Sequence, residues 1–225
     1  MTAAGLSFVS MQSLLFGVQG AALFGDAAAQ ERFVTGMRRA ILVAGRFGIP
    51  NLVFGSPGQR NVPEGLSAAA ARHIAAGVSR TLGDAAAAAG TRLGIEFNPA
   101  AYGTNFLNTH DEVADFVAAV DHPAVTIILD VGALHMNGHF EAIEAIAPRL
   151  APRVSHVHLS EPQLAPAPAR PEQAARVIRA MGAAGYAGWF SVEMKAPPDG
   201  LAGVEATLER LTAAAALSEP EKVPA

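Results

Sequence analysis

Residues 125–132 read VTIILDVG, a continuous run of apolar and β-branched residues that ends at Asp130 and a turn glycine. A run this apolar is typical of a parallel strand that is covered on both faces. An acidic residue is tolerated in such a strand only at its end, where it can be paired or can bind a cation. The stretch therefore predicts a buried strand whose carboxyl end carries a functional side chain.

Three other segments repeat this arrangement of a short apolar strand with one metal-ligand type of side chain near its end. They are RLGIEFNP with Glu96, VSHVHLSEP with His158, and GWFSVEMK with Glu193. Consecutive strand ends converge on one point in a parallel barrel. We therefore expect these three side chains and Asp130 to come together in one site.

The composition indicates a globular protein and excludes several classes of partner. The chain has 225 residues, of which 51% are hydrophobic, which is enough to bury a large core. A net charge of −4 provides no basic face for a phosphate backbone, so we expect no nucleic-acid partner. No apolar run reaches the ~18 residues of a membrane span, so we expect no membrane partner. The lack of cysteine fits a reducing, cytoplasmic location.

Predicted strands and helices alternate along the whole chain. Six strand–helix units without a hairpin signal predict a parallel sheet with helical crossovers. No Gly-rich phosphate turn such as GxGxxG occurs, which favours a TIM (β/α)8-type barrel over a doubly wound sheet. We expect one partial barrel domain at 1–217, truncated to about six strand–helix units, and a disordered tail at 218–225. The expected strands are 6–12, 51–55, 92–98, 125–132, 153–160 and 188–194, and the expected helices are 26–47, 68–89, 111–120, 140–150, 172–183 and 201–217.

The four strand-end side chains form a set of ligands with a definite chemistry. Two Glu, one Asp and one His suit Mn²⁺, Mg²⁺ or Co²⁺, and Zn²⁺ is possible. Three carboxylates packed together without a cation would repel one another. A metal ion held here polarises a carbonyl and an adjacent hydroxyl, while a neighbouring carboxylate moves a proton on carbon. This chemistry suits the isomerisation or epimerisation of a small sugar, sugar phosphate or sugar acid.

The segments IEFNP, LDVG, HVHLSEP and SVEMK together resemble the xylose isomerase-like TIM-barrel superfamily, in the sugar isomerase and epimerase branch that includes D-tagatose 3-epimerase and hydroxypyruvate isomerase. The resemblance implies one divalent metal ion held by Glu96, Asp130, His158 and Glu193. It further implies that Glu96 and Glu193 act as the acid and base across an enediolate intermediate. It also implies that residues 6–12 correspond to the third strand of the family, so that this chain lacks the first two strand–helix units.

The resemblance is weaker at the substrate site than at the metal site. Where it implies a substrate-binding His, Arg and Glu, this chain has Ala133, Leu164 and Tyr102. The identity of the sugar is therefore not carried over. His156 and His158 share one strand face, and we assign His158 to the metal because it lies nearer the strand end. The candidate substrate-binding residues are Arg60, Asn98, Tyr102, His135 and His156.

Two other functions stay open on the same residues. A metal ion beside a base also suits a lyase or dehydratase, and a truncated barrel suits a protein that only binds a ligand or a partner. The strands at 6–12 and 188–194 would each lack the neighbour that closes a barrel, and unpaired apolar edges favour association. We therefore expect a small-molecule carbohydrate as substrate and a homo-oligomer as a possible assembly.

Overall fold

The computed structural model describes residues 5–219. Within them the strands form a parallel sheet in the order β1-β2-β3-β4-β5, with helices between successive strands. The chain divides into two compact units, Met1–Ile128 and Leu129–Ala225, and strand β3 (Val125–Asp130) runs from the first into the second. The strand order confirms the predicted parallel α/β fold of the TIM-barrel type, in which each strand lies beside the next one in the sequence.

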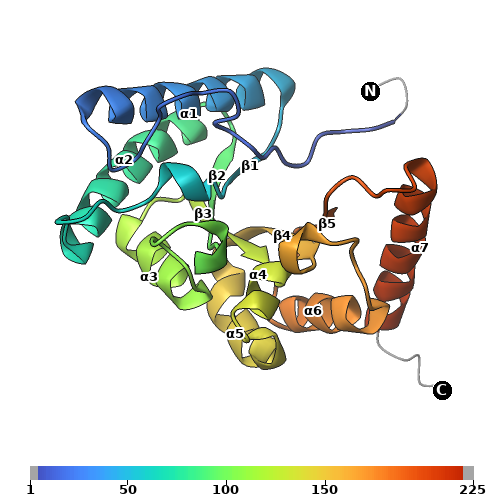
Figure 1. The fold of residues 1–225 in the computed structure, drawn as a ribbon. Helices are drawn as coiled ribbons and strands as arrows, with labels where there is room; N and C mark the ends of the chain where they lie inside the picture. The colour runs from blue at the N-terminus through green and yellow to red at the C-terminus, as the bar shows by residue number, and fades with distance from the viewer. Residues whose placement is uncertain (1–4, 220–225) are drawn as a thin grey trace. The chain divides into compact units, whose positions relative to one another are not determined.

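The first unit consists of long helices packed beside buried strands. Helices α1 and α2 pack on each other, and α2 also contacts α3 (Figure 1). Strand β1 pairs in parallel with β2, and β2 pairs in parallel with β3. The elements before β3 are α1 (Ala27–Phe47), β1 (Asn51–Phe54), the 3-10 helix η2 (Pro57–Gln59), α2 (Ala68–Ala88), β2 (Arg92–Glu96), the 3-10 helix η3 (Ala100–Tyr102) and α3 (His110–Val120).

Polar caps fix where these three helices begin. The side chains of Asp26 and Ser67 accept hydrogen bonds from backbone N–H groups in the first turns of α1 and α2. Thr109 and Glu112 form a reciprocal capping box at the start of α3. Gly48, in the left-handed conformation at φ 64°, ends α1. Each of these helices therefore starts at a residue whose local chemistry can be recognised in the sequence, and α1 also stops at one.

The second unit contains β4 and β5, which pair in parallel, with α6 packed on both α5 and α7 (Figure 1). The short helix α4 (Val131–Met136) follows β3 without a connecting loop, which the sequence does not predict. The remaining elements are η4 (Phe140–Ala142), α5 (Ile143–Leu150), η5 (Ala151–Arg153), β4 (Val154–Ser160), η6 (Pro162–Leu164), α6 (Pro171–Ala183), β5 (Trp189–Glu193) and α7 (Leu201–Ser218).

The N-terminal end of the chain differs from the sequence prediction. The strand expected at 6–12 is reduced to an isolated parallel bridge between Met11 and Leu52, with Met11 N donating to Asn51 O and Met11 O accepting from Val53 N. The tail expected at 218–225 lies outside the described residues beyond Glu219, and α7 extends to Ser218. No helix within residues 5–219 is long and apolar enough to cross a membrane.

Candidate metal centre

Asp130 ends strand β3 and also caps the helix that follows it. Its Oδ1 accepts a hydrogen bond from the backbone N–H of Ala133 at 2.5 Å, which starts α4. Its Oδ2 accepts a hydrogen bond from the hydroxyl of Ser160 at 2.6 Å. The carboxylate is therefore held at both oxygens, by its own helix and by the end of β4.

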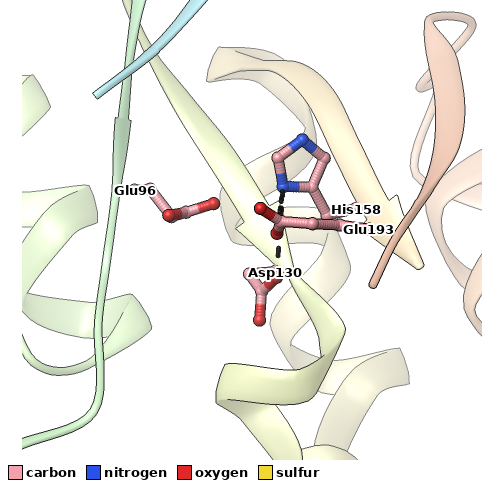
Figure 2. A group of neighbouring side chains, drawn as sticks. All are labelled: Glu96, Asp130, His158 and Glu193. Atoms are coloured by element: carbon pink, nitrogen blue, oxygen red, sulfur yellow. Dashed lines mark ion pairs between the residues drawn. The ribbon is translucent and has the colours of Figure 1, made fainter. Parts of the chain in front are cut away.

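His158 and Glu193 meet through the register of β4 and β5. His158 lies opposite Ser191, and Ser160 lies opposite Glu193. Residues two apart on a strand share one face of the sheet, so this register places the imidazole and the carboxylate on the same side. His158 Nδ1 lies 2.9 Å from Glu193 Oε2 and 4.0 Å from Asp130 Oδ2 (Figure 2).

These three side chains of the second unit form a compact and nearly closed cluster. The exposed fraction of the side chain is 10% for Asp130, 4% for His158 and 19% for Glu193. Each offers one ligand atom, and these atoms lie within 4.8 Å of one another. Two carboxylates thus share one imidazole in a place where little water can solvate them. Burying the two negative charges costs free energy unless a positive charge is supplied. The cluster fits a divalent metal ion that accepts oxygen and nitrogen ligands.

His156 lies deeper in the same sheet and contacts a different partner. Its ring is fully buried, and its Nε2 lies 2.7 Å from Ser191 Oγ. Burial is the main cause that lowers the pKa of His156 to about 4, the neighbouring His158 lowers it further, and Glu193 opposes the shift. His156 is therefore a neutral, buried imidazole at pH 7, as expected if His158 is the histidine of the cluster.

Glu96 belongs to the first unit, where it is the last residue of β2 and is buried. Its Oε2 accepts a hydrogen bond from Asn98 Nδ2 at 3.1 Å. A Cβ atom on Gly55 would lie 2.5 Å from Glu96 Oε2, so the glycine makes room for the carboxylate. Glu96, labelled in Figure 2, pairs in register with Ile128, two residues before Asp130 on β3.

Arg60 lies in the core of the first unit, although its Gly/Pro loop gives no sign of burial in the sequence. It is fully buried, and its guanidinium donates to the backbone carbonyls of Glu96 at 2.7 Å and Leu107 at 3.4 Å. Burial is the main cause that lowers the pKa of Arg60 to about 10, and Glu96 partly offsets it. In this arrangement Arg60 supports the end of β2 and offers no exposed surface to a substrate.

Tyr102 and His135 are the two remaining candidate substrate-binding residues. Tyr102 is half-buried in the 3-10 helix η3. His135, near the end of α4, stacks on Phe140 with ring centroids 3.9 Å apart and planes inclined by 15°. Their roles in substrate binding stay predictions.

The sequence model of the xylose isomerase-like TIM barrel family matches residues 1–214. The chain belongs to this family. The match confirms the resemblance found in the four strand-end segments. No curated protein matches the sequence.

Several solved structures share the fold of this chain at low sequence identity. The 3-keto-D-glucoside 4-epimerase of E. coli has a TM-score of 0.76 at 14% identity, over 96% of this chain and 81% of that chain. The D-psicose 3-epimerase of Clostridium cellulolyticum H10 has a TM-score of 0.72 at 15% identity, over 96% and 79%. A xylose isomerase-like TIM barrel protein of Mycobacterium smegmatis in complex with magnesium has a TM-score of 0.63 at 20% identity, over 97% and 76%.

Proposed function

We propose that this member of the xylose isomerase-like family is a metal-dependent isomerase or epimerase of a small carbohydrate. The observation that carries the proposal is the cluster of Asp130, His158 and Glu193 at the carboxyl ends of β3, β4 and β5. Functional residues of TIM barrels lie at this end of the strands. Two of the structural neighbours are sugar epimerases, and a third holds magnesium, which favours this activity.

In this proposal Glu96 is the fourth metal ligand. It ends the strand that pairs with β3, and its register partner Ile128 precedes Asp130 by two residues. The family resemblance assigns Glu96 to the metal as well. When bound, the metal ion would polarise the carbonyl and an adjacent hydroxyl of the substrate. The chain's own contribution is to hold Asp130, His158 and Glu193 together at the strand ends of the second unit.

Glu193 and Glu96 move the proton. Glu193 has the most exposed side chain of the three clustered residues, so it can reach a bound substrate. One carboxylate takes the proton from the carbon next to the carbonyl, and the electron pair of that C–H bond forms the double bond of an enediolate. The other carboxylate returns a proton to carbon. Return to the opposite face of the same carbon gives an epimer. Return to the former carbonyl carbon gives an isomer, because the proton of the neighbouring hydroxyl then passes to the former carbonyl oxygen and the carbonyl forms at the neighbouring carbon. Neither outcome requires an oxidant or a reductant.

The test is exchange of carbon-bound hydrogen in D₂O. Protein loaded with Mn²⁺ would be incubated with aldoses, ketoses, their phosphates and sugar acids, and deuterium at carbon would be followed by NMR. We expect deuterium in an epimerised or isomerised product, and a loss of about 10²–10⁴-fold in rate for Glu193→Gln and Glu96→Gln. Glu205→Gln, an exposed position on α7, is the matched control and should keep full activity.

The same experiment distinguishes the other functions. A lyase or dehydratase would release water or a fragment and give a product of lower mass. A protein that only binds its ligand would incorporate no deuterium with any sugar, and that result would contradict the proposal. Full activity of either glutamine variant would remove that glutamate from the mechanism.

A further inference from the structure

Ser160 occupies the end of β4, two residues beyond His158, and is 2% exposed. Its hydroxyl makes two hydrogen bonds with opposite roles. The backbone N–H of Gly132 donates to Ser160 Oγ at 2.8 Å, and Ser160 Oγ donates to Asp130 Oδ2 at 2.6 Å. Because an N–H can only donate, the hydroxyl oxygen must accept from Gly132. Its proton is then available to the carboxylate.

The close approach of α4 to the end of β4 depends on Gly132. A Cβ atom at this position would lie 2.7 Å from the backbone oxygen of Glu161 and 3.1 Å from Ser160 Oγ. A contact below 3.0 Å to backbone forces the two segments apart. The glycine therefore allows its own N–H to reach Ser160, and this bond aims the hydroxyl at Asp130.

Two hydrogen bonds hold the carboxylate of Asp130 in one orientation. Ala133 N–H fixes Oδ1 and Ser160 fixes Oδ2, so rotation of the carboxylate would break at least one of two buried hydrogen bonds. A buried group whose hydrogen bond is broken is not compensated by water, so such rotation is unfavourable. Ser160 also shares a strand face with His158, so it ties the carboxylate on β3 to the imidazole on β4.

We propose that Ser160 is a positioning residue for the metal ligand Asp130, and that the bonds from Gly132 through Ser160 to Asp130 set the metal affinity of the cluster. The proposal rests on the proposed metal site. Residues that orient a metal ligand through a hydrogen bond typically change metal affinity by about 10–100-fold when they are replaced. Ser160 itself touches neither the metal position nor the substrate in this assignment.

The experiment is a titration of the chelator-treated full chain with Mn²⁺, followed by calorimetry and by electron paramagnetic resonance. We expect Ser160→Ala to weaken binding by about 10–100-fold and to broaden the Mn²⁺ spectrum, because Asp130 then takes several orientations. Ser191→Ala, which removes a hydroxyl on the same sheet that contacts His156, is the matched control and should bind as the wild type does. The double variant Asp130→Asn/Ser160→Ala should bind no more weakly than Asp130→Asn alone, because Ser160 acts through Asp130.

Each outcome supports or overturns the proposal. Equal Mn²⁺ affinity and equal spectra of Ser160→Ala and the wild type would overturn the positioning role and leave the metal site in place. Absence of Mn²⁺ binding by the wild type would overturn the metal site and the positioning role together. If Ser160→Ala does not fold, Ser160→Thr and Ser160→Val have nearly equal volume and differ in the hydroxyl. Tighter binding by the threonine variant supports the proposal, and equal binding overturns it.

Discussion

The two units hold buried carboxylates in different ways. In the first unit Glu96 lies near a cation of the protein itself, because the fully buried Arg60 donates to the Glu96 backbone carbonyl and interacts electrostatically with the side chain. In the second unit Asp130 and Glu193 share the single imidazole of His158. The first arrangement brings a fixed positive charge to its carboxylate, whereas the second brings two negative groups to a ring that is neutral or carries one charge.

This difference indicates which unit gains the most stability from a bound metal ion. Positive charge in the first unit is part of the folded chain, so it stabilises the unit whether or not a ligand is present. In the second unit the carboxylates gain a full countercharge only when a cation binds. Removing the fixed cation should therefore destabilise the protein in every condition. Removing a ligand of the second unit should mainly reduce the additional stability that a bound metal ion supplies.

The largest expected change in the free energy of unfolding is that caused by Arg60→Met. The change removes the guanidinium donor from the backbone carbonyls of Glu96 and Leu107, of which Leu107 still accepts from the N–H of Asn98, and it leaves Glu96 without its neighbouring cation. Removal of one partner of a buried charge pair typically lowers the free energy of unfolding by about 3–5 kcal/mol. Urea denaturation monitored by circular dichroism measures the change, both with and without Mn²⁺.

Arg39→Met is the control for this variant. Arg39 also donates to a backbone carbonyl, that of Phe16 at 3.3 Å, but its side chain is exposed. Its loss should change the free energy of unfolding by less than about 0.5 kcal/mol. Equal effects of the two substitutions would show that the buried cation is not important to the first unit.

The second effect is the stabilisation of the protein by metal. A ligand at 100 times its dissociation constant raises the free energy of unfolding by about 2.7 kcal/mol if it binds only the folded state. Wild-type protein should gain this amount from Mn²⁺, and Asp130→Asn should gain little. Asp199→Asn, an exposed acidic position in the same unit, should gain as much as the wild type. An undiminished gain in Asp130→Asn would remove Asp130 from the site.

Local sequence patterns predicted the positions of most helices and strands in both units. The starts of α1, α2 and α3 and the apolar runs of the strands are properties of short segments, and they lie within a few residues of their expected positions. The strand-end positions of Asp130 and Glu193 follow from the same runs. Contacts between distant segments could not be predicted in this way.

Three residues show why contacts between distant segments could not be predicted from local patterns: Arg60, Ser160 and Gly132. The burial of Arg60 depends on carbonyl groups more than thirty residues away, and a Gly/Pro-rich loop is ordinarily exposed. The role of Ser160 requires α4 to begin directly at Asp130, and a six-residue helix leaves little periodicity to detect. Gly132 appears in the sequence as a turn residue, whereas the structure shows that it permits a close backbone approach. The signal that could have revealed Ser160 is its position two residues after His158 on the same strand face.

A smaller effect concerns Trp189, the only tryptophan of the chain, which is 60% exposed at the start of β5. Strand β5 is the last strand of the sheet and pairs only with β4 among the described strands. We expect the fluorescence of a water-exposed indole, and Trp189→Thr should change the free energy of unfolding by less than about 0.5 kcal/mol.

The same fluorescence tests the expected homo-oligomer. If a second copy covers the edge of β5, the emission should shift to shorter wavelength as the protein concentration rises, in step with the mass measured by light scattering. A monomer at all concentrations with constant emission would contradict association through this edge.

The smallest expected effect is the pH dependence contributed by His135. Burial is the main cause that lowers the pKa of His135 below its ordinary value of about 6.5, with Arg170 lowering it and Glu161 and Glu141 opposing. The unfolded chain therefore binds a proton at this residue more readily than the folded chain does. The stabilising contribution is fully present above about pH 6.5 and falls as the pH decreases through the folded-state pKa. His135→Phe keeps a ring against Phe140 and removes the titration. The loss of unfolding free energy between about pH 7.5 and 5.5 should be smaller in this variant than in the wild type, and the remaining loss belongs to other groups such as His156. An equal loss in both proteins would show that the folded and unfolded chains bind protons equally at His135.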